Sequence, residues 1–165
     1  MNALYLSYRQ AEAKDLDRIM EIEQTGFSAA EAASRPAMQE RIQKIPDSFI
    51  VAENAQEIVG YVVGPVVAVR YLYDELFEKT TANPETGGYQ TILSLVVAPE
   101  YQRSGVASAL LDQLKQICQH KQRAGITLTC LEELIPFYQR NGYQLEGVSA
   151  SEHAGETWYN LVSEL

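Results

Sequence analysis

The chain has 165 residues, of which 46% are hydrophobic and 21% are charged, and its net charge is −9. This composition is typical of a globular protein and excludes a disordered one, and the length suits one domain over residues 1–165. The densest basic cluster is only Lys115, Lys121 and Arg123, so we expect no nucleic-acid partner.

The sequence also lacks the patterns of membrane, secreted and metal-binding proteins. No apolar run approaches the roughly 20 residues that span a bilayer, and the N-terminal MNALYLSYRQ does not resemble a signal peptide. Two cysteines, Cys118 and Cys130, and two distant histidines, His120 and His153, form neither a disulfide framework nor a metal motif. We therefore expect a cytoplasmic protein with no membrane partner and no metal site.

The first part of the chain predicts a strand and two helices. Residues 4–9 alternate in polarity as a strand does. Residues 16–22 place apolar side chains at helical spacing, and this helix is expected to end near Gly26. The alanine-rich segment 29–44 predicts a second helix that Pro36 interrupts.

The middle of the chain predicts a hairpin and a long connection. Residues 48–53 and 57–67 read as two strands that turn near Asn54. In the segment 70–88 we expect one helical turn at residues 72–77 and then a polar loop, of the kind that often carries substrate specificity.

The last part of the chain alternates between strands and helices. The predicted elements are an apolar strand at 89–99, a strongly amphipathic helix at 105–121, a strand at 125–130, a helix at 131–141, and strands at 143–148 and 157–162. This order predicts an α/β protein with a mixed sheet.

The segment LSLVVAPEYQRSGVASALL, residues 93–111, is the most informative about function. A buried strand ends at Pro99, and QRSGVA then begins the long helix. The unpaired N–H groups and positive dipole end of a helix start suit a pyrophosphate, and Gly105 lets the backbone approach the phosphates. The alternative is that Gly105 only eases a strand-to-helix turn. P-loop and dinucleotide motifs are both missing from the sequence.

These residues resemble the GNAT family of N-acetyltransferases. QRSGVA fits that family's Q/R-x-x-G-x-G/A signature at Gln102, Gly105 and Ala107, and the order of elements is similar from about residue 4 to residue 162. The resemblance implies a mostly antiparallel sheet of about six to seven strands, with a parallel central pair and about four helices. It also implies acetyl-CoA as the donor, with its pantetheine arm on Leu95, Val96 and Val97 and its pyrophosphate on Gln102, Arg103, Ser104, Gly105, Val106, Ala107 and Ser108.

The segment CLEELIPFYQRNGY, residues 130–143, is similar to the GNAT helix that ends in a Phe-Tyr pair. The resemblance makes Tyr138 the candidate catalytic acid for the departing thiolate. A phenol that titrates near pH ~10 holds its proton at neutral pH, as this role requires. The alternative is a core aromatic residue that packs with Phe137.

Within the family, the chain resembles the bacterial relatives of the arylalkylamine (serotonin-type) branch. The similar positions are Cys130, Leu134, Pro136, Phe137 and Tyr138, together with Asp74–Phe77 and Gly147–Gly155. Many other GNAT enzymes carry Asn where this chain has Leu131.

The chain departs from the animal enzymes of that branch at Thr91 and Leu93, where those enzymes carry two histidines thought to help remove the amine's proton. The remaining candidates for this base are His153, Glu75, Asp74 or a chain of water molecules, and His153 is equally suited to a solvated loop.

The expected reaction is direct acetyl transfer to a primary amine, a small (aryl)alkylamine, in a ternary complex. Backbone N–H groups near Leu95 to Val97 are expected to polarise the carbonyl, and a covalent route through Cys130 is the alternative mechanism. The alternative functions are a protein N-terminal or lysine acetyltransferase, a non-catalytic acyl-CoA-binding module, and an unrelated α/β module that binds another phosphate. The resemblance is also compatible with a homodimer.

Overall fold

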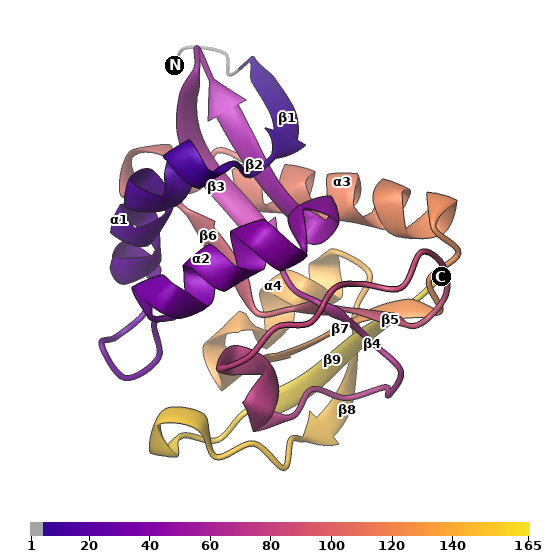
Figure 1. Ribbon diagram of the computed structural model, residues 1–165. Helices are drawn as coiled ribbons and strands as arrows, with labels where there is room; N and C mark the ends of the chain where they lie inside the picture. The colour runs from indigo at the N-terminus through magenta and orange to yellow at the C-terminus, as the bar shows by residue number, and fades with distance from the viewer. Residues whose placement is uncertain (1–4) are drawn as a thin grey trace.

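The computed structural model describes residues 5–165, whose arrangement is shown in Figure 1. These residues form nine strands in two sheets and four α-helices. The strands are β1 (Leu6–Gln10), β2 (Phe49–Asn54), β3 (Glu57–Val63), β4 (Val66–Val67), β5 (Tyr89–Ile92), β6 (Ser94–Val97), β7 (Gly125–Cys130), β8 (Gln144–Val148) and β9 (Tyr159–Glu164). The helices are α1 (Leu16–Gly26), α2 (Arg35–Lys44), α3 (Val106–His120) and α4 (Ile135–Arg140). No helix of this described part is long and apolar enough to cross a membrane.

The predicted mixed α/β fold is confirmed. The first sheet has the order β1-β2-β3-β6 and is antiparallel, and the second has the order β4-β5-β7-β9-β8 with a parallel pair, β5 and β7. The described residues contain more strands than the predicted six or seven because two expected strands, at residues 57–67 and 89–99, are each broken in two.

Each break has a local cause. Pro65 has no N–H to donate, so the strand that began as β3 cannot continue its ladder, and β4 pairs with β5 instead. In the second case the chain changes partner: β5 pairs with β7 as far as Ile92, and then the N–H of Leu93 donates to the carbonyl of Val63 at 2.8 Å. The following strand, β6, pairs with β3 alone and therefore forms an edge of the first sheet.

Two hydrophobic cores lie on opposite faces of the first sheet. Phe49 and Val51 on β2 belong to the core that includes apolar residues of α1 and α2, whereas Ile50 and Ala52 belong to the core that includes α3. This alternation follows from the two-residue period of a strand. Figure 1 shows α1 and α2 together on one side of this sheet and α3 on the other.

Most predicted elements are present, and the clearest error concerns the second helix. It does not start at residue 29 but at Arg35, because Ser34 caps it by accepting a hydrogen bond from the Ala37 N–H at 3.2 Å. Pro36 therefore lies in the first helical turn, where its missing N–H costs nothing, and it does not interrupt the helix. The predicted first strand included Leu4, which lies outside the described residues.

The predicted hairpin, helix 105–121 and strand 125–130 are confirmed. The hairpin turns at Ala55 and Gln56, which have φ values of 52° and 69°, as expected for a two-residue turn that follows the twist of its strands. The predicted helix at 131–141 is a short 3-10 turn, Glu132–Leu134, followed by α4.

Candidate functional site

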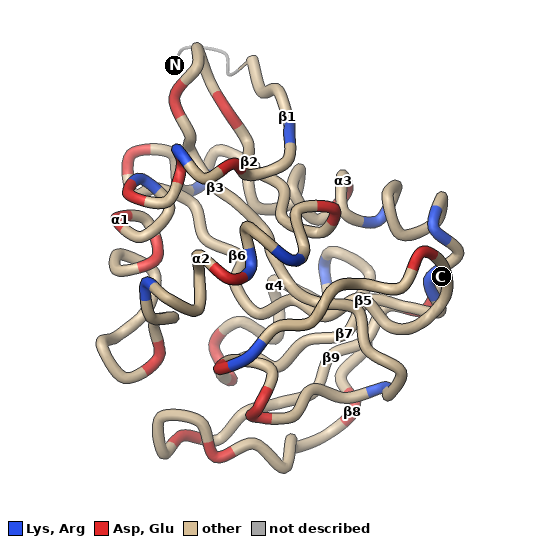
Figure 2. Tube along the Cα trace, in the orientation of Figure 1, with Lys and Arg blue, Asp and Glu red and all other residues tan. Residues whose placement is uncertain are grey.

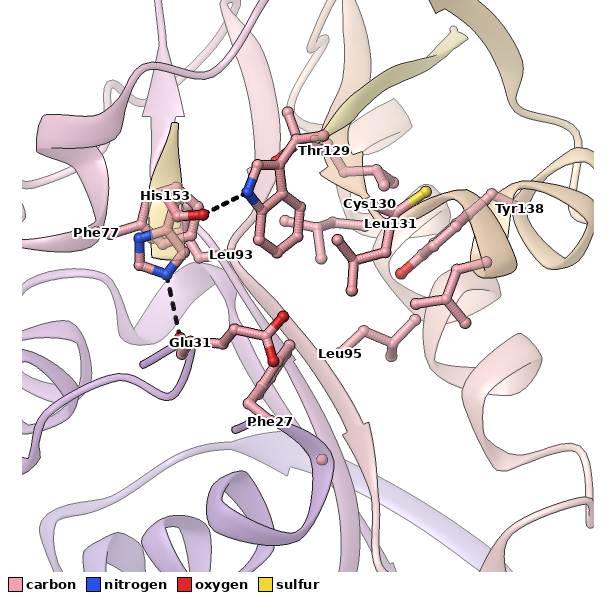
Figure 3. A pocket seen from close by; sticks show the side chains of 15 residues that line it. Phe27, Glu31, Phe77, Leu93, Leu95, Thr129, Cys130, Leu131, Tyr138 and His153 are labelled. Atoms are coloured by element: carbon pink, nitrogen blue, oxygen red, sulfur yellow. Dashed lines mark hydrogen bonds between the residues drawn. The ribbon is translucent and has the colours of Figure 1, made fainter. Parts of the chain in front are cut away.

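Two cavities meet where β6 separates from the second sheet. The larger, about 640 Å³, lies over the start of α3, and we call it the helix-start cavity. The smaller, about 160 Å³, is mainly lined by hydrophobic side chains, and we call it the apolar cavity (Figure 3). Leu95, Leu134 and Tyr138 line both cavities, so these residues mark their junction.

The start of α3 is open on the side of the helix-start cavity. Gly105 is the N-cap residue with φ of 87°, a left-handed conformation that glycine adopts without strain, and no side chain caps the helix there. A Cβ atom at Gly105 would meet no heavy atom within 4 Å. Ser104 and Gln102 instead bind the loop itself, through the carbonyls of Tyr101 and Val97. No side chain among residues 5–165 accepts from the first N–H groups of α3, which suits an anion.

The predicted phosphate-binding residues lie together, with one exception. Gln102, Arg103, Gly105, Val106, Ala107 and Ser108 all line the helix-start cavity, whereas Ser104 does not. Two arginines, Arg103 and Arg140, line the cavity, and none of its lining residues is a carboxylate. In a chain of net charge −9, this local excess of positive charge also suits an anion.

Arg140 is a site residue that the sequence did not reveal. It lies in the last turn of α4, well separated along the chain from the QRSGVA segment. Only the folding of α4 beside the start of α3 brings it to the same cavity. The sequence signal that could have identified Arg140 is its place two positions after the Phe-Tyr pair.

The three predicted residues of β6 do not face the same way. The N–H of Ala98 donates to the carbonyl of Val59 on β3 at 2.8 Å, and residues of an antiparallel ladder alternate in direction. The backbone groups of Val96 therefore face β3, and those of Leu95 and Val97 face the free edge of the sheet. The side chains follow the same division: Leu95 and Val97 line the helix-start cavity, and Val96 is buried in the core with α1.

Tyr138 is buried, and its hydroxyl points into the apolar cavity (Figure 3). Its ring packs edge-on against Phe137 and Tyr143, with ring centroids 5.0 Å and 5.6 Å apart. The hydroxyl makes no hydrogen bond to any residue that the structure describes. Burial, with a smaller effect of Cys130, raises the pKa of the Tyr138 phenol, so it keeps its proton at neutral pH. Tyr138 is thus a buried aromatic residue that also presents a proton donor to the cavity.

His153 belongs to the wall of the apolar cavity and is not a solvated loop residue. Its ring stacks on Phe77 with centroids 4.9 Å apart, and its backbone carbonyl accepts a hydrogen bond from the indole N–H of Trp158 at 2.8 Å. Its Nε2 lies 3.3 Å from the carbonyl oxygen of Glu31. Because a carbonyl oxygen only accepts, Nε2 carries a proton in this contact.

The other candidate bases do not line the apolar cavity. Asp74 accepts a hydrogen bond from the Ser151 hydroxyl at 2.5 Å and lines a separate neighbouring cavity, and Glu75 is exposed and lines none of the cavities described here. Thr91 is buried and donates to the carbonyl of Pro65 at 2.6 Å, so it is not at the cavity, whereas Leu93 lines it. Of the predicted candidates, only His153 lines the apolar cavity.

Cys130 lines the apolar cavity, but its environment does not favour a nucleophile. The thiol is buried, and this burial raises its pKa to about 12, with a smaller contribution from Glu133. A thiol with this pKa is almost entirely protonated at neutral pH, whereas the nucleophile is the thiolate. The burial of the Cys130 thiol therefore disfavours the covalent alternative.

Comparisons with known proteins agree with this arrangement. The family model described as "Acetyltransferase (GNAT) domain" matches residues 46–145. Ard1 from Thermoplasma volcanium is 19% identical with a TM-score of 0.75, and the alignment covers 97% of each chain. The GphF GNAT-like decarboxylase, solved with isobutyryl-CoA, is 16% identical with a TM-score of 0.81, covering 96% of this chain and 98% of the other. Naa50 from Arabidopsis thaliana, solved with the bisubstrate analogue CoA-Ac-MVNAL, is 15% identical with a TM-score of 0.72, covering 97% and 99%.

At these identities, the structural similarities establish the fold alone, and it is the GNAT fold that the sequence predicted. The family match confirms the expected enzyme class, an N-acetyltransferase, and the expected donor, acetyl-CoA. Because the match spans more than half of the chain, it shows that this protein belongs to the GNAT family of acetyltransferases.

Proposed function

We propose that this enzyme transfers the acetyl group directly to a small primary amine of the arylalkylamine type, in a ternary complex. The observation that carries the proposal is the position of Tyr138 at the junction of a basic, open cavity and an apolar, more enclosed one. A donor with an anionic end and an acceptor with an apolar skeleton would meet at this residue.

The residues of the helix-start cavity fit coenzyme A. Its diphosphate would lie on the uncapped start of α3, from Gly105 to Ser108, with Arg103 and Arg140 nearby. Its pantetheine arm would pair with the free edge of β6 through the backbone groups of Leu95 and Val97, as an added strand does. Val96 would contribute packing in the core and no direct contact.

Acetyl-CoA supplies the activated acetyl thioester, and the chain supplies position and protons. The edge N–H groups of β6 are available to polarise a carbonyl that lies beside them. The ammonium group must first lose one proton to solvent; the phenol of Tyr138 can then give its proton to the departing thiolate, and the second proton that the nitrogen loses after attack restores the phenol. The mainly hydrophobic lining disfavours water in the same space, which would limit hydrolysis.

The apolar cavity supports a hydrophobic acceptor. Its lining includes aromatic and aliphatic side chains from α4, both sheets and five connecting segments; those with large apolar groups are Phe27, Phe77, Ile92, Leu93, Leu95, Leu128, Leu131, Leu134 and Trp158. Aromatic side chains are well suited to pack against an aryl group. These contacts agree with the sequence similarity to the arylalkylamine branch.

Acetylation assays with matched acceptor panels test the proposal. The purified chain is mixed with acetyl-CoA and either small amines, including 2-phenylethylamine, or peptides with free N-termini and lysines, and thiol release is measured. We expect activity on the small amines. Activity on peptides alone contradicts the proposed acceptor class. Binding of acetyl-CoA with no activity on either panel favours a non-catalytic acyl-CoA-binding module.

A further inference from the structure

The apolar cavity contains one carboxylate that neither the sequence nor the proposed chemistry assigned. Among its lining residues, all within the described part of the chain, Glu31 is the only acidic side chain. It lies in the connection between α1 and α2, and its carboxylate extends toward the middle of the cavity (Figure 3). Glu31 is partly buried, and its charge stands out in a wall that is otherwise mainly hydrophobic.

The position of Glu31 is fixed by its surroundings. The Ser28 N–H donates to Glu31 Oε1 at 3.0 Å, and His153 Nε2 donates to the Glu31 backbone carbonyl at 3.3 Å. His153 is itself held by its stacking on Phe77. The contact with His153 joins two segments that are far apart in the sequence and holds the Glu31 backbone at the cavity wall.

The carboxylate is ionised under neutral conditions. The pKa of Glu31 lies below its ordinary value, chiefly because the Ser28 hydroxyl hydrogen-bonds the charged form, with further contributions from Glu156 and His153. The Ser28 N–H binds Oε1, and the carboxylate faces the cavity, where an ammonium group can approach it (Figure 3).

Acidic side chains gather at one end of the site and basic side chains at the other. Glu31 also lines a neighbouring cavity of about 390 Å³, together with Glu23, Asp74 and Glu78. The only arginine in that lining, Arg41, is fully buried and donates to the carbonyl of Phe77 at 3.1 Å. The helix-start cavity at the other end has two arginines and no carboxylate in its lining. Figure 2 shows acidic positions along α1, in the connection after it and between β8 and β9. This separation of charge attracts a cation to the acidic end and an anion to the basic end.

We propose that Glu31 determines acceptor specificity by binding the ammonium group of the incoming amine across the apolar cavity from Tyr138. This inference rests on the proposed function and narrows its class of acceptor. The acceptor is an amine that is protonated in solution and carries an apolar skeleton without a carboxylate beside the nitrogen. A charge-assisted contact in a cavity lined mainly by hydrophobic side chains is strong, and a carboxylate on the acceptor would repel Glu31.

Glu31 acts in this account as a positioning residue and not as the base. A carboxylate that stabilises an ammonium group favours its protonated form, so it contributes to binding more than to the chemical step. Its removal should therefore raise KM for the amine and leave kcat little changed. Removal of a catalytic base would instead lower kcat and leave the KM for the amine little changed.

Steady-state kinetics with 2-phenylethylamine test the inference in the wild type, Glu31→Gln and the control Glu85→Gln. Glu85 is exposed, lines none of the cavities described here, and loses the same charge. We expect Glu31→Gln to raise KM for the amine by about tenfold to a hundredfold, with kcat and the KM for acetyl-CoA within about threefold of the wild type. Glu85→Gln should match the wild type. An unchanged amine KM in Glu31→Gln, or a loss of kcat at constant KM, overturns the inference.

A weaker base separates charge recognition from a merely structural effect. The β,β-difluoro analogue of 2-phenylethylamine has nearly the same shape but is largely uncharged at an alkaline pH where the parent amine is still protonated. The penalty of Glu31→Gln should nearly disappear for this analogue. An equal penalty on both compounds contradicts charge recognition. Phenylalanine, which adds a carboxylate beside the nitrogen, should be a poor acceptor for the wild type.

Calorimetric titration of the amine into the coenzyme A complex distinguishes failure of this inference from failure of the proposed function. If the wild type binds 2-phenylethylamine, Glu31→Gln binds it at least about tenfold more weakly, and no acetyl transfer occurs, the inference stands and the proposed function fails. If the wild type acetylates the amine and both proteins bind it equally well, the inference fails and the function stands. If the wild type binds no amine, both are contradicted.

Discussion

Glu31 and Tyr138 lie across the same apolar cavity from each other, one in the connection between α1 and α2 and the other on α4 (Figure 3). The first is an ionised carboxylate and the second a protonated phenol. Tyr138 also lines the basic helix-start cavity, as Leu95 and Leu134 do, so it lies at the junction between the cation-attracting and the anion-attracting parts of the site. This arrangement suits the joining of an amine to a group carried by an anionic donor.

Replacing Tyr138 with Phe should reduce kcat by about a hundredfold or more, because the phenol is the proposed proton donor. The KM for acetyl-CoA and the melting temperature should change little, since the ring remains and no described residue hydrogen-bonds the hydroxyl. Steady-state kinetics and thermal denaturation measure these effects. Because burial raises the pKa of this phenol, wild-type activity should not fall through ionisation of Tyr138 below a pH of about 10.

The matched control is Tyr143→Phe. Tyr143 is also buried, and burial likewise raises its pKa, but it lines neither cavity. It should retain nearly full kcat. Equal losses in the two variants would mean that Tyr138 contributes only packing.

Replacing Arg140 with Gln should weaken coenzyme A binding by about three- to tenfold, the size of a partly exposed charge contact. The salt dependence of binding should also become less steep, because one positive charge near the phosphates is lost. Fluorescence or calorimetric titration at several salt concentrations measures both effects. Lys115→Gln removes the same charge from an exposed position of α3 that does not line the cavity, and it should bind like the wild type.

The sequence predicted the main elements and the anion-binding helix start because these depend on local signals. The apolar periodicity of α3 and the glycine at its start are contiguous in the chain, and both were found in the structure. The partner change at Leu93 was not predictable in this way, because an uninterrupted apolar run looks like one strand whether it joins one sheet or two.

Glu31 and Arg140 escaped prediction for a different reason. Each lies in a segment whose own pattern is unremarkable, and each reaches the site only through long-range packing. The contact between His153 and Glu31 joins residues 122 positions apart, a separation over which periodicity carries no information. Tertiary contacts of this kind can be identified only once the fold is known.

A charge cluster outside the cavities should make stability depend on acid pH. Hydrogen bonding from Arg70, with a contribution from Tyr71, lowers the pKa of Glu146 to about 2, and the Arg70–Glu146 distance is 2.6 Å. A carboxylate whose pKa is depressed by folding stabilises the fold above its ordinary pKa and loses that contribution as the pH falls. The melting temperature of the wild type should therefore decline between pH values of about 4.5 and 2.

Glu146→Gln tests this assignment, because glutamine cannot titrate. Its melting temperature should be lower than that of the wild type at neutral pH and should converge with it as the pH approaches about 2. Thermal denaturation monitored by circular dichroism across this range is the measurement, with the exposed Glu132→Gln as the control. A constant difference between Glu146→Gln and the wild type at all pH values would show that titration of Glu146 is not the cause.

Calorimetric titration of coenzyme A into the wild type, Gly105→Glu and Gly147→Glu tests most directly whether the open start of α3 binds the donor. Both glycines have positive φ, 87° and 92°, and a Cβ at either meets no heavy atom within 4 Å, so the two substitutions introduce similar backbone strain and the same charge. We predict that the wild type and Gly147→Glu bind coenzyme A with similar affinity, whereas Gly105→Glu, which places a carboxylate at the helix start, binds it at least about a hundredfold more weakly. Unchanged affinity in Gly105→Glu, or no binding by the wild type at millimolar coenzyme A, would contradict the account.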